Sequence, residues 1–248
     1  MTAARPHPRS PTTFGQADER LEAVLESLEG ATNYSRWIYD AFSDQLGERV
    51  LEVGAGRGTI SSLIAKDHFL TALEPSSTHV GALRQTLSEA EARIVHGTID
   101  DLPTDHRFDA VVLVNTLEHI EDDGKALQTI HHHLVPNGRV ILWVPAFDIL
   151  YGRFDHQIGH FRRYRRRDLV SLCEEKGFVV RRARYVNFVG FFAWLIVVRL
   201  LGTTPTAGRL ALVFDRFVVP VMSRVERRVA PPLGQSLLVI GERVEPHS

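Results

Sequence analysis

Short apolar segments alternate with helix-like segments along most of the chain, and this alternation limits the possible folds more than any other feature. The apolar segments span residues 49–55, 69–76, 92–100, 108–115 and 139–146. Strands that are apolar on both faces and separated by helices form a parallel sheet covered on both sides. The sequence therefore predicts an α/β, doubly wound, Rossmann-like architecture.

The two ends of the chain differ from this pattern. Residues 1–17 are rich in Pro, Ser and Thr and predict a disordered tail, followed by helices up to residue 46. Two further strands are expected at 177–187 and 235–244, with a mainly apolar helical cap insertion at about 188–234. We therefore expect residues 18–248 to form a single domain.

Several classes of protein are excluded by composition. The longest apolar run, Phe188–Val198, has 11 residues, whereas a membrane span needs about 20. The tail lacks the apolar region of a signal peptide, and the lone Cys173 suits a reducing compartment and a place in the core. The net charge of −1 and the lack of a basic domain argue against nucleic acid as a partner. The expected protein is soluble and cytoplasmic.

A glycine-rich loop, "VLEVGAGRGTIS", joins the first strand of the alternating region to a helix-like segment. No Gly-Lys-Ser/Thr follows Gly54, so a Walker loop is excluded. The dinucleotide pattern is incomplete, because Thr59 stands where the third glycine is required. Glu52 would repel a pyrophosphate and would instead suit a ligand that carries an ammonium or sulfonium group.

Three more segments follow neighbouring strands and should meet at the carboxyl edge of the sheet, where open α/β sheets bind ligands. Glu74 ends the second strand, 22 residues after Glu52, where a carboxylate can accept both hydroxyls of a ribose. The segment "GTIDDLP" at 97–103 could hold an adenine, and Asn115 with "LEHI" follows the fourth strand.

In this order the motifs resemble the class I S-adenosylmethionine-dependent methyltransferases, over residues 33–186 and the terminal strand. The resemblance implies a seven-stranded sheet whose last strand is antiparallel, and S-adenosyl-L-methionine as cofactor. Relatives often carry an aspartate where Thr98 stands, so either Thr98 or Asp100 would bond the adenine. The implied cofactor-binding residues are Tyr34, Glu52, Gly54, Ala55, Gly56, Glu74, Pro75, Thr98, Ile99, Asp100, Asn115 and His119.

The loop "LYGRFDHQIGHFRRYRRRDL" resembles a narrower bacterial branch of this family that is tied to glycan and natural-product biosynthesis. His160 is the preferred general base, although a histidine that only orders the loop is an equally open interpretation. Likewise, "RRYRRR" is ordinarily a solvated basic edge. The predicted substrate residues are Tyr151, His160, Arg162, Arg163 and Tyr164.

No metal is expected. The run "HHH" at 131–133 points its side chains about 100° apart on a helix, so they cannot converge on one ion and should form a solvated face. Tyr34 and Trp37 should pack the N-terminal helix against the domain, although that helix could also cover the cofactor.

The predicted reaction is methyl transfer to a small-molecule acceptor, at oxygen, by in-line displacement. The alternatives are a nicotinamide-dependent oxidoreductase and a cofactor-binding protein without turnover. The apolar insertion could pack as a cap over the sheet, be buried in a homodimer contact, or cover a lipid-like acceptor. In the last case Arg162 and Arg163 would hold the anionic head of a prenyl, lipid-linked or phosphate-bearing intermediate. Weak association with a membrane surface is a separate expectation.

Overall fold

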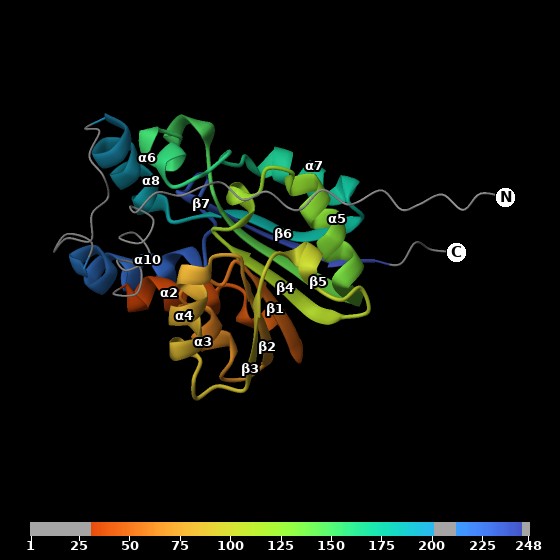
Figure 1. The fold of residues 1–248 in the computed structure, drawn as a ribbon. Helices are drawn as coiled ribbons and strands as arrows, with labels where there is room; N and C mark the ends of the chain where they lie inside the picture. The colour runs from red at the N-terminus through yellow and green to blue at the C-terminus, as the bar shows by residue number, and fades with distance from the viewer. Residues whose placement is uncertain (1–30, 201–211, 245–248) are drawn as a thin grey trace.

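The computed structural model describes residues 31–200 and 212–244, so the predicted disordered tail and the helix expected from residue 18 lie outside the described residues. A single seven-stranded sheet forms the centre, in the order β3-β2-β1-β4-β5-β7-β6 (Figure 1). The strands are β1 Arg49–Val53, β2 Phe69–Glu74, β3 Ala92–His96, β4 Phe108–Val114, β5 Leu134–Pro145, β6 Phe178–Val186 and β7 Ser236–Arg243.

The direction of the last strand confirms the predicted fold class. β1 to β5 pair in parallel, whereas β7 inserts between β5 and β6 and runs antiparallel to both. Ile240 of β7 pairs with Ile141 of β5 on one side and with Arg182 of β6 on the other. The molecule therefore has the sheet expected of a class I methyltransferase.

Both faces of the sheet are buried, which explains why the strands are apolar throughout. Val111 and Leu113 of β4 belong to one hydrophobic cluster, while Ala110 and Val112 belong to the cluster on the opposite face. Helices α5 and α7 lie on the first side, and α2, α3 and α4 lie on the second (Figure 1). The polar ends of the strands, rather than their faces, are thus left to carry a site.

The α-helices between β1 and β6, and the helix that precedes β1, are α2 Thr32–Asp40, α3 Ser61–Ile64, α4 Ser77–Thr86, α5 Asp123–His133, α6 Arg153–Gln157 and α7 Arg166–Glu175. The same part of the chain contains four short 3₁₀ turns, η1 Ser43–Gln45, η2 Ile99–Asp101, η3 Leu117–His119 and η4 Asp148–Leu150. Trp37 of α2 is buried edge-on against Trp143 of β5. The predicted packing role of Trp37 is therefore confirmed.

The segment between β6 and β7 is helical where the structure describes it. It contains α8 Phe188–Trp194, the π-helical η5 Leu195–Leu200 and η6 Phe214–Val218, and α10 Val219–Glu226. Asp215 anchors this segment to α2, because its carboxylate accepts hydrogen bonds from the backbone N–H groups of Asn33 and Tyr34. Within the described residues, no helix is both long and apolar enough to cross a membrane.

Two of the predicted surface segments are partly buried. His133 of α5 is buried and pairs through its ring with the carbonyl of His106, so the prediction that 131–133 form a solvated face is wrong for that residue. Arg163 and Tyr164 are buried as well, so "RRYRRR" is not a wholly solvated edge. Cys173 is buried in the core, as predicted, and burial raises the pKa of its thiol to about 12, which makes it unreactive.

Candidate active site

The loops that carry the predicted site residues meet at one edge of the sheet because the five parallel strands, β1 to β5, end there in register. Val53 pairs with Leu73, Leu73 with Val95, and Val114 with Trp143. Beyond these pairs the backbone turns through left-handed conformations at Gly54, Asn115 and Phe147. Conformations of this kind are costly for side chains other than glycine and gather at functional edges.

The glycine loop crosses over the end of β2. The backbone N–H groups of Gly54 and Ala55 both donate to the carbonyl of Leu73, at 2.8 and 3.0 Å. A Cβ at Gly54 would lie 2.5 Å from a side-chain carbon of Thr116, whereas a Cβ at Gly56 would meet no atom within 4 Å. The loop is therefore tightly packed toward β4 and open at Gly56, which leaves room for a ligand against the backbone.

Glu74 holds this loop in place. One oxygen of its buried carboxylate accepts from the N–H of Gly56 at 2.7 Å, and the other accepts from the N–H of Ser76 at 2.8 Å. The ring of His79 lies 3.4 Å from the second oxygen. Each carboxylate oxygen can accept more than one hydrogen bond, so Glu74 can still receive ribose hydroxyls while it fixes the loop.

Glu52 lies under the glycine loop and is buried. The Ser61 hydroxyl donates to its carboxyl group. Burial raises the pKa of Glu52 to about 8, the Ser61 bond opposes the rise, and the nearby Glu74 adds to it. A cation bound beside Glu52 would be the partner that this group lacks.

The predicted adenine segment forms the turn η2. The backbone N–H and the hydroxyl of Thr98 both donate to Asp101, while Asp100 forms an ion pair with Lys125 at 3.2 Å. Ile99 is buried in the core beneath them. The choice between Thr98 and Asp100 as the partner of the adenine stays a prediction, since each already has a partner within the protein.

These residues fit S-adenosylmethionine. The opening at Gly56 offers room, the Glu74 carboxylate at the end of β2 offers acceptors for ribose hydroxyls, and the buried Glu52 below the loop offers a counter-charge. Asn115 and Pro75 follow the neighbouring strand ends. Tyr34 lies in α2, where its ring packs edge-on against Trp37, and its role in binding stays a prediction.

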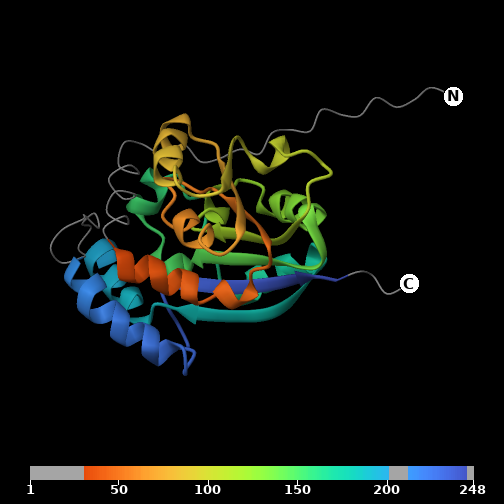
Figure 2. The same ribbon diagram turned by 90° about the horizontal axis from the view of Figure 1, so that it is seen from below.

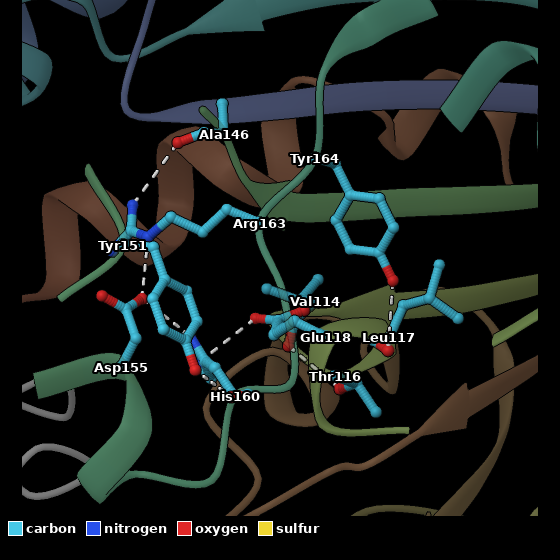
Figure 3. A network of polar contacts seen from close by, with 10 residues as sticks. All are labelled: Val114, Thr116, Leu117, Glu118, Ala146, Tyr151, Asp155, His160, Arg163 and Tyr164. Carbon is cyan, nitrogen blue, oxygen red and sulfur yellow. Dashed lines mark hydrogen bonds and ion pairs between the residues drawn. The ribbon is translucent and has the colours of Figure 1, made fainter. Parts of the chain in front are cut away.

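A buried polar network forms the other half of the edge, after β5 (Figure 3). The ring Nδ1 of His160 lies 2.9 Å from Asp155, and Asp155 also accepts from the guanidinium of Arg163 at 2.7 Å. The Tyr151 hydroxyl donates to the backbone carbonyl of His160 at 2.8 Å. Asp155 thus holds the ring of His160, and Tyr151 holds its backbone carbonyl. The side chain of His160 is only 8% exposed.

The remaining ring nitrogen of His160 points toward Glu118. Its Nε2 lies 3.7 Å from a carboxyl oxygen of Glu118, and both Glu118 oxygens are buried without a hydrogen-bond partner among the described residues. Arg163 and His160 keep the pKa of Asp155 below its usual value despite burial, so Asp155 is the ionised acceptor of the Nδ1–H. That tautomer leaves Nε2 as a free base.

Burial dominates the protonation states around this pair. It raises the pKa of Glu118 to about 8, and it lowers the pKa of His160 below its usual value, although Asp155 opposes that change. His119 stacks edge-on to His160 with ring centres 4.5 Å apart, and burial lowers its pKa to about 3. At neutral pH both histidines are therefore uncharged, and Glu118 carries a proton for much of the time.

Glu118, His119 and His160 also bring three ligand atoms within 4.8 Å of one another. A divalent cation could be held by one carboxylate and two neutral imidazoles in this arrangement. The Glu118 oxygen, at 3.7 Å, lies beyond hydrogen-bond distance of the His160 Nε2. The expectation that no metal is required stays a prediction.

The arginines predicted to hold an anionic head already have carboxylate partners. Arg163 is bonded to Asp155, while Arg162 pairs with Asp123 at 2.7 Å and donates to the carbonyl of Glu121. The Tyr164 hydroxyl donates to Asp123 at 2.9 Å and lies away from His160 (Figure 3). The structure thus brings Tyr151 and Arg163 to His160, and it places Arg162 and Tyr164 around Asp123.

Two residues at the centre of this network were not singled out from the sequence. Glu118 was read only as part of "LEHI", and Asp155 was not considered, although it lies five residues before His160. The adjacent Glu-His pair after a strand could have drawn attention to Glu118. No local signal marks Asp155, because its partners become visible only when the loop is folded.

Comparison with known proteins agrees with this geometry. Residues 27–183 match the methyltransferase domain family. A ubiquinone biosynthesis O-methyltransferase of Rickettsia felis is 25% identical over 126 residues, which cover 50% of this chain and 48% of that protein. A demethylmenaquinone methyltransferase of Clavibacter sepedonicus is 32% identical over 140 residues, which cover 50% of this chain and 57% of that protein.

Solved structures show the same fold. An S-adenosylmethionine-dependent methyltransferase from Clostridium acetobutylicum aligns with a TM-score of 0.58 at 10% identity, covering 86% of this chain and 92% of that one. The N-methyltransferase NodS from Bradyrhizobium japonicum, solved with S-adenosyl-L-homocysteine, aligns with a TM-score of 0.55 at 13% identity, covering 86% of each chain.

The chain therefore belongs to the S-adenosylmethionine-dependent methyltransferase family, as the resemblance of its motifs implied. It spans about half the length of the curated relatives it matches. The family match excludes the nicotinamide-dependent oxidoreductase that the glycine loop left open.

Proposed function

We propose that this domain transfers a methyl group to a hydroxyl oxygen of a lipophilic small molecule, with His160 as the general base. The observation that carries the proposal is the contact of His160 with Asp155 on one side and Glu118 on the other. An imidazole held neutral, with a fixed tautomer and a free Nε2, is suited to remove the proton of an acceptor hydroxyl.

S-adenosylmethionine supplies an activated methyl group on a sulfonium when it is bound. Transfer would break the S–CH₃ bond as the O–CH₃ bond forms, and Nε2 of His160 would accept the hydroxyl proton. The imidazolium that results is stabilised by the ionised Asp155, which is bonded to Nδ1. Arg163 and the Tyr151 hydroxyl keep the histidine and its loop in position while the charge changes.

Two observations support a lipophilic acceptor. The relatives named above act in ubiquinone and menaquinone biosynthesis, and α8, an apolar helix, reaches this loop. Trp194 of α8 stacks under the Arg163 guanidinium at 4.9 Å and packs edge-on against Phe154. We do not retain the anionic head in the proposal, because Arg162 and Arg163 would both have to release their carboxylate partners.

Labelled methyl transfer to a matched set of acceptors tests the proposal. The set is a prenylated catechol, the same compound with its hydroxyls blocked, and unprenylated catechol. We expect transfer to the prenylated catechol above all. Methylation of the blocked compound would identify a carbon acceptor, and equal use of both catechols would contradict a lipophilic site.

A pair of variants tests the base. His160→Ala should lower kcat by about 10²–10⁴-fold while its affinity for S-adenosylmethionine, measured by calorimetry, stays within about twofold of the parent protein. His156→Ala is the matched control, because His156 is exposed and lies in the same loop region. A kcat loss below about tenfold in a folded His160→Ala protein would assign His160 a positioning role only.

A further inference from the structure

The helical insertion exposes a continuous apolar stripe. Phe217, Val221 and Val225 follow one another at intervals of four residues along η6 and α10, Val229 lies just beyond the end of α10, and all four residues are between 56% and 63% exposed. Residues four apart lie on the same face of a helix. A surface helix ordinarily turns its apolar face toward the core. The apolar stripe of this helix is instead exposed to solvent.

The opposite face of the same helix is firmly anchored, so the outward direction of the stripe is fixed. Asp215 is buried and bonded to α2, while Val219 and Met222 pack in the core. Glu226 is buried and accepts from the backbone N–H groups of Asn187 and Phe188 at 3.0 and 2.9 Å. Rotation of the helix to bury the valines would break these bonds and expose the core residues.

Helix α8 extends the apolar surface on the other side of a groove. Phe188 and Val189 of α8 line this groove together with Phe217, Val221 and Val225, and the prolines at 231 and 232 also contribute to its lining. Phe192 of α8 and Ile196 of η5 are also exposed. Figure 2 shows α10 at one end of the molecule beside α2. Contiguous apolar surface of this kind marks a contact with another apolar body.

The charged residues around the stripe have one sign. Within the described segment 212–230 the acidic residues, Asp215 and Glu226, are both buried and bonded within the protein. The exposed charged residues of that segment are Arg216, Arg224, Arg227 and Arg228. A helix that combines an apolar face with flanking arginines has the composition of helices that lie in the plane of a membrane.

We propose that this face, formed by α8, η5, η6 and α10, docks on the surface of an anionic lipid bilayer. The apolar side chains enter the boundary between headgroups and acyl chains, and the four arginines meet lipid phosphates. The described helices are too short or too polar to cross the bilayer, so the contact lies in one leaflet. The proposal does not depend on the acceptor named under the proposed function.

Charge separates this occupant from a second copy of the chain. A twofold contact brings the same surface of two copies together, so it would gather the flanking arginines of both copies at one interface. The described segment 212–230 offers no exposed acid to pair with them. An anionic lipid surface supplies the missing negative charge, and each basic residue near such a surface strengthens binding about fivefold.

The docking face is physically joined to the catalytic loop. Trp194 at the end of α8 donates from its indole N–H to the carbonyl of Leu150 and stacks on Arg163, which is bonded to Asp155. An acceptor dissolved in the bilayer would therefore arrive beside His160 without crossing bulk water. Docking would thus explain why the apolar face is exposed, whereas a cap that only covered the sheet would bury it.

Vesicle flotation of the full chain tests the proposal. We expect binding to phosphatidylcholine vesicles that contain 30 mol% phosphatidylglycerol, and at least tenfold weaker binding to pure phosphatidylcholine. Arg224→Glu/Arg228→Glu should weaken binding to anionic vesicles by at least about 30-fold, and Phe217→Ser/Val221→Ser should reduce it to background. Matched controls are Arg84→Glu/Arg93→Glu and Phe69→Ser, which change exposed residues on other elements and should bind like the parent.

Size-exclusion chromatography with light scattering on the same proteins completes the test. Because the substituted side chains are exposed, all variants should keep the parent's melting temperature and mass. The proposal is overturned if the parent does not float with anionic vesicles, or if the controls lose binding as much as the docking-face variants. It is also overturned if the parent is a dimer that Phe217→Ser/Val221→Ser dissociates, since the face would then be covered by a second copy.

Discussion

The glycine loop after β1 and the loop after β5 reach the same edge of the sheet, but they are held there by different means. The first is fixed by backbone groups: Gly54 and Ala55 bond to Leu73, and Gly56 bonds to Glu74. The second is fixed by side chains, since Asp155 joins His160 to Arg163 and Tyr151 bonds to His160. Backbone N–H groups, bonded to a carbonyl and to the Glu74 carboxylate, hold the proposed cofactor half, whereas contacts between side chains hold the ring of His160 in the proposed acceptor half.

The largest effect should come from breaking the side-chain half. Asp155→Ala leaves the buried Arg163 without its carboxylate, which should lower the free energy of unfolding by about 3–5 kcal/mol. Asp148→Ala is the control, because Asp148 pairs with Arg165 on the surface, where both side chains are about 60% exposed, and should cost less than about 1 kcal/mol. Urea denaturation measures both. Equal losses would mean that the loop after β5 does not rely on its buried charges.

The next effect concerns the backbone half. Glu74→Ala should weaken the binding of S-adenosylmethionine by about 1.5–3 kcal/mol through lost charge-assisted hydrogen bonds. Calorimetry measures the affinity, and Glu89→Ala, at an exposed position after α4, provides the baseline. Unchanged affinity in the Glu74→Ala protein would remove Glu74 from the cofactor site and leave it only as a support for the loop.

This difference also explains what the sequence could and could not predict. The fold follows from alternating apolar segments, and the cofactor half follows from motifs such as "VLEVGAGRGTIS", in which the spacing of the glycines determines the backbone. In the acceptor half, the contacts depend on where side chains turn after folding. The sequence predicts that Arg163 faces a ligand, but its side chain is buried against Asp155. The motif around Arg163 does not indicate which carboxylate it will meet after folding.

Protonation offers a finer test of the acceptor half. The pKa of Glu118 rises from an ordinary 4.5 in the unfolded chain to about 8 in the folded protein. The folded state therefore keeps a proton that the unfolded state loses, so stability falls as pH rises from about 4.5 to about 8. Glu118→Gln should remove this loss and gain at least about 1 kcal/mol at pH 8.5.

Thermal or urea denaturation of the Glu118→Gln protein between pH 5 and pH 8.5 measures the change. Glu121→Gln, at an exposed neighbouring position, should keep the pH dependence of the parent. If Glu118→Gln keeps it too, then Glu118 is ionised in the folded protein at neutral pH, and a bound cation becomes the better explanation of its unpartnered oxygens.

The smallest expected effect concerns Glu52, which is buried below the glycine loop in the backbone half of the site. Its pKa of about 8 means that much of it is protonated at neutral pH, whereas a sulfonium beside it would favour the ionised form. The affinity for S-adenosylmethionine should therefore rise with pH, about three- to tenfold between pH 6.5 and pH 8.5. The uncharged thioether S-adenosylhomocysteine should change less than about twofold, and Glu52→Gln should make the two ligands behave alike. Calorimetry at each pH measures the affinities. If both ligands showed the same pH dependence in the parent protein, the only role of Glu52 would be to hold Ser61 under the loop. The cofactor would then be bound by the backbone of the glycine loop and by Glu74.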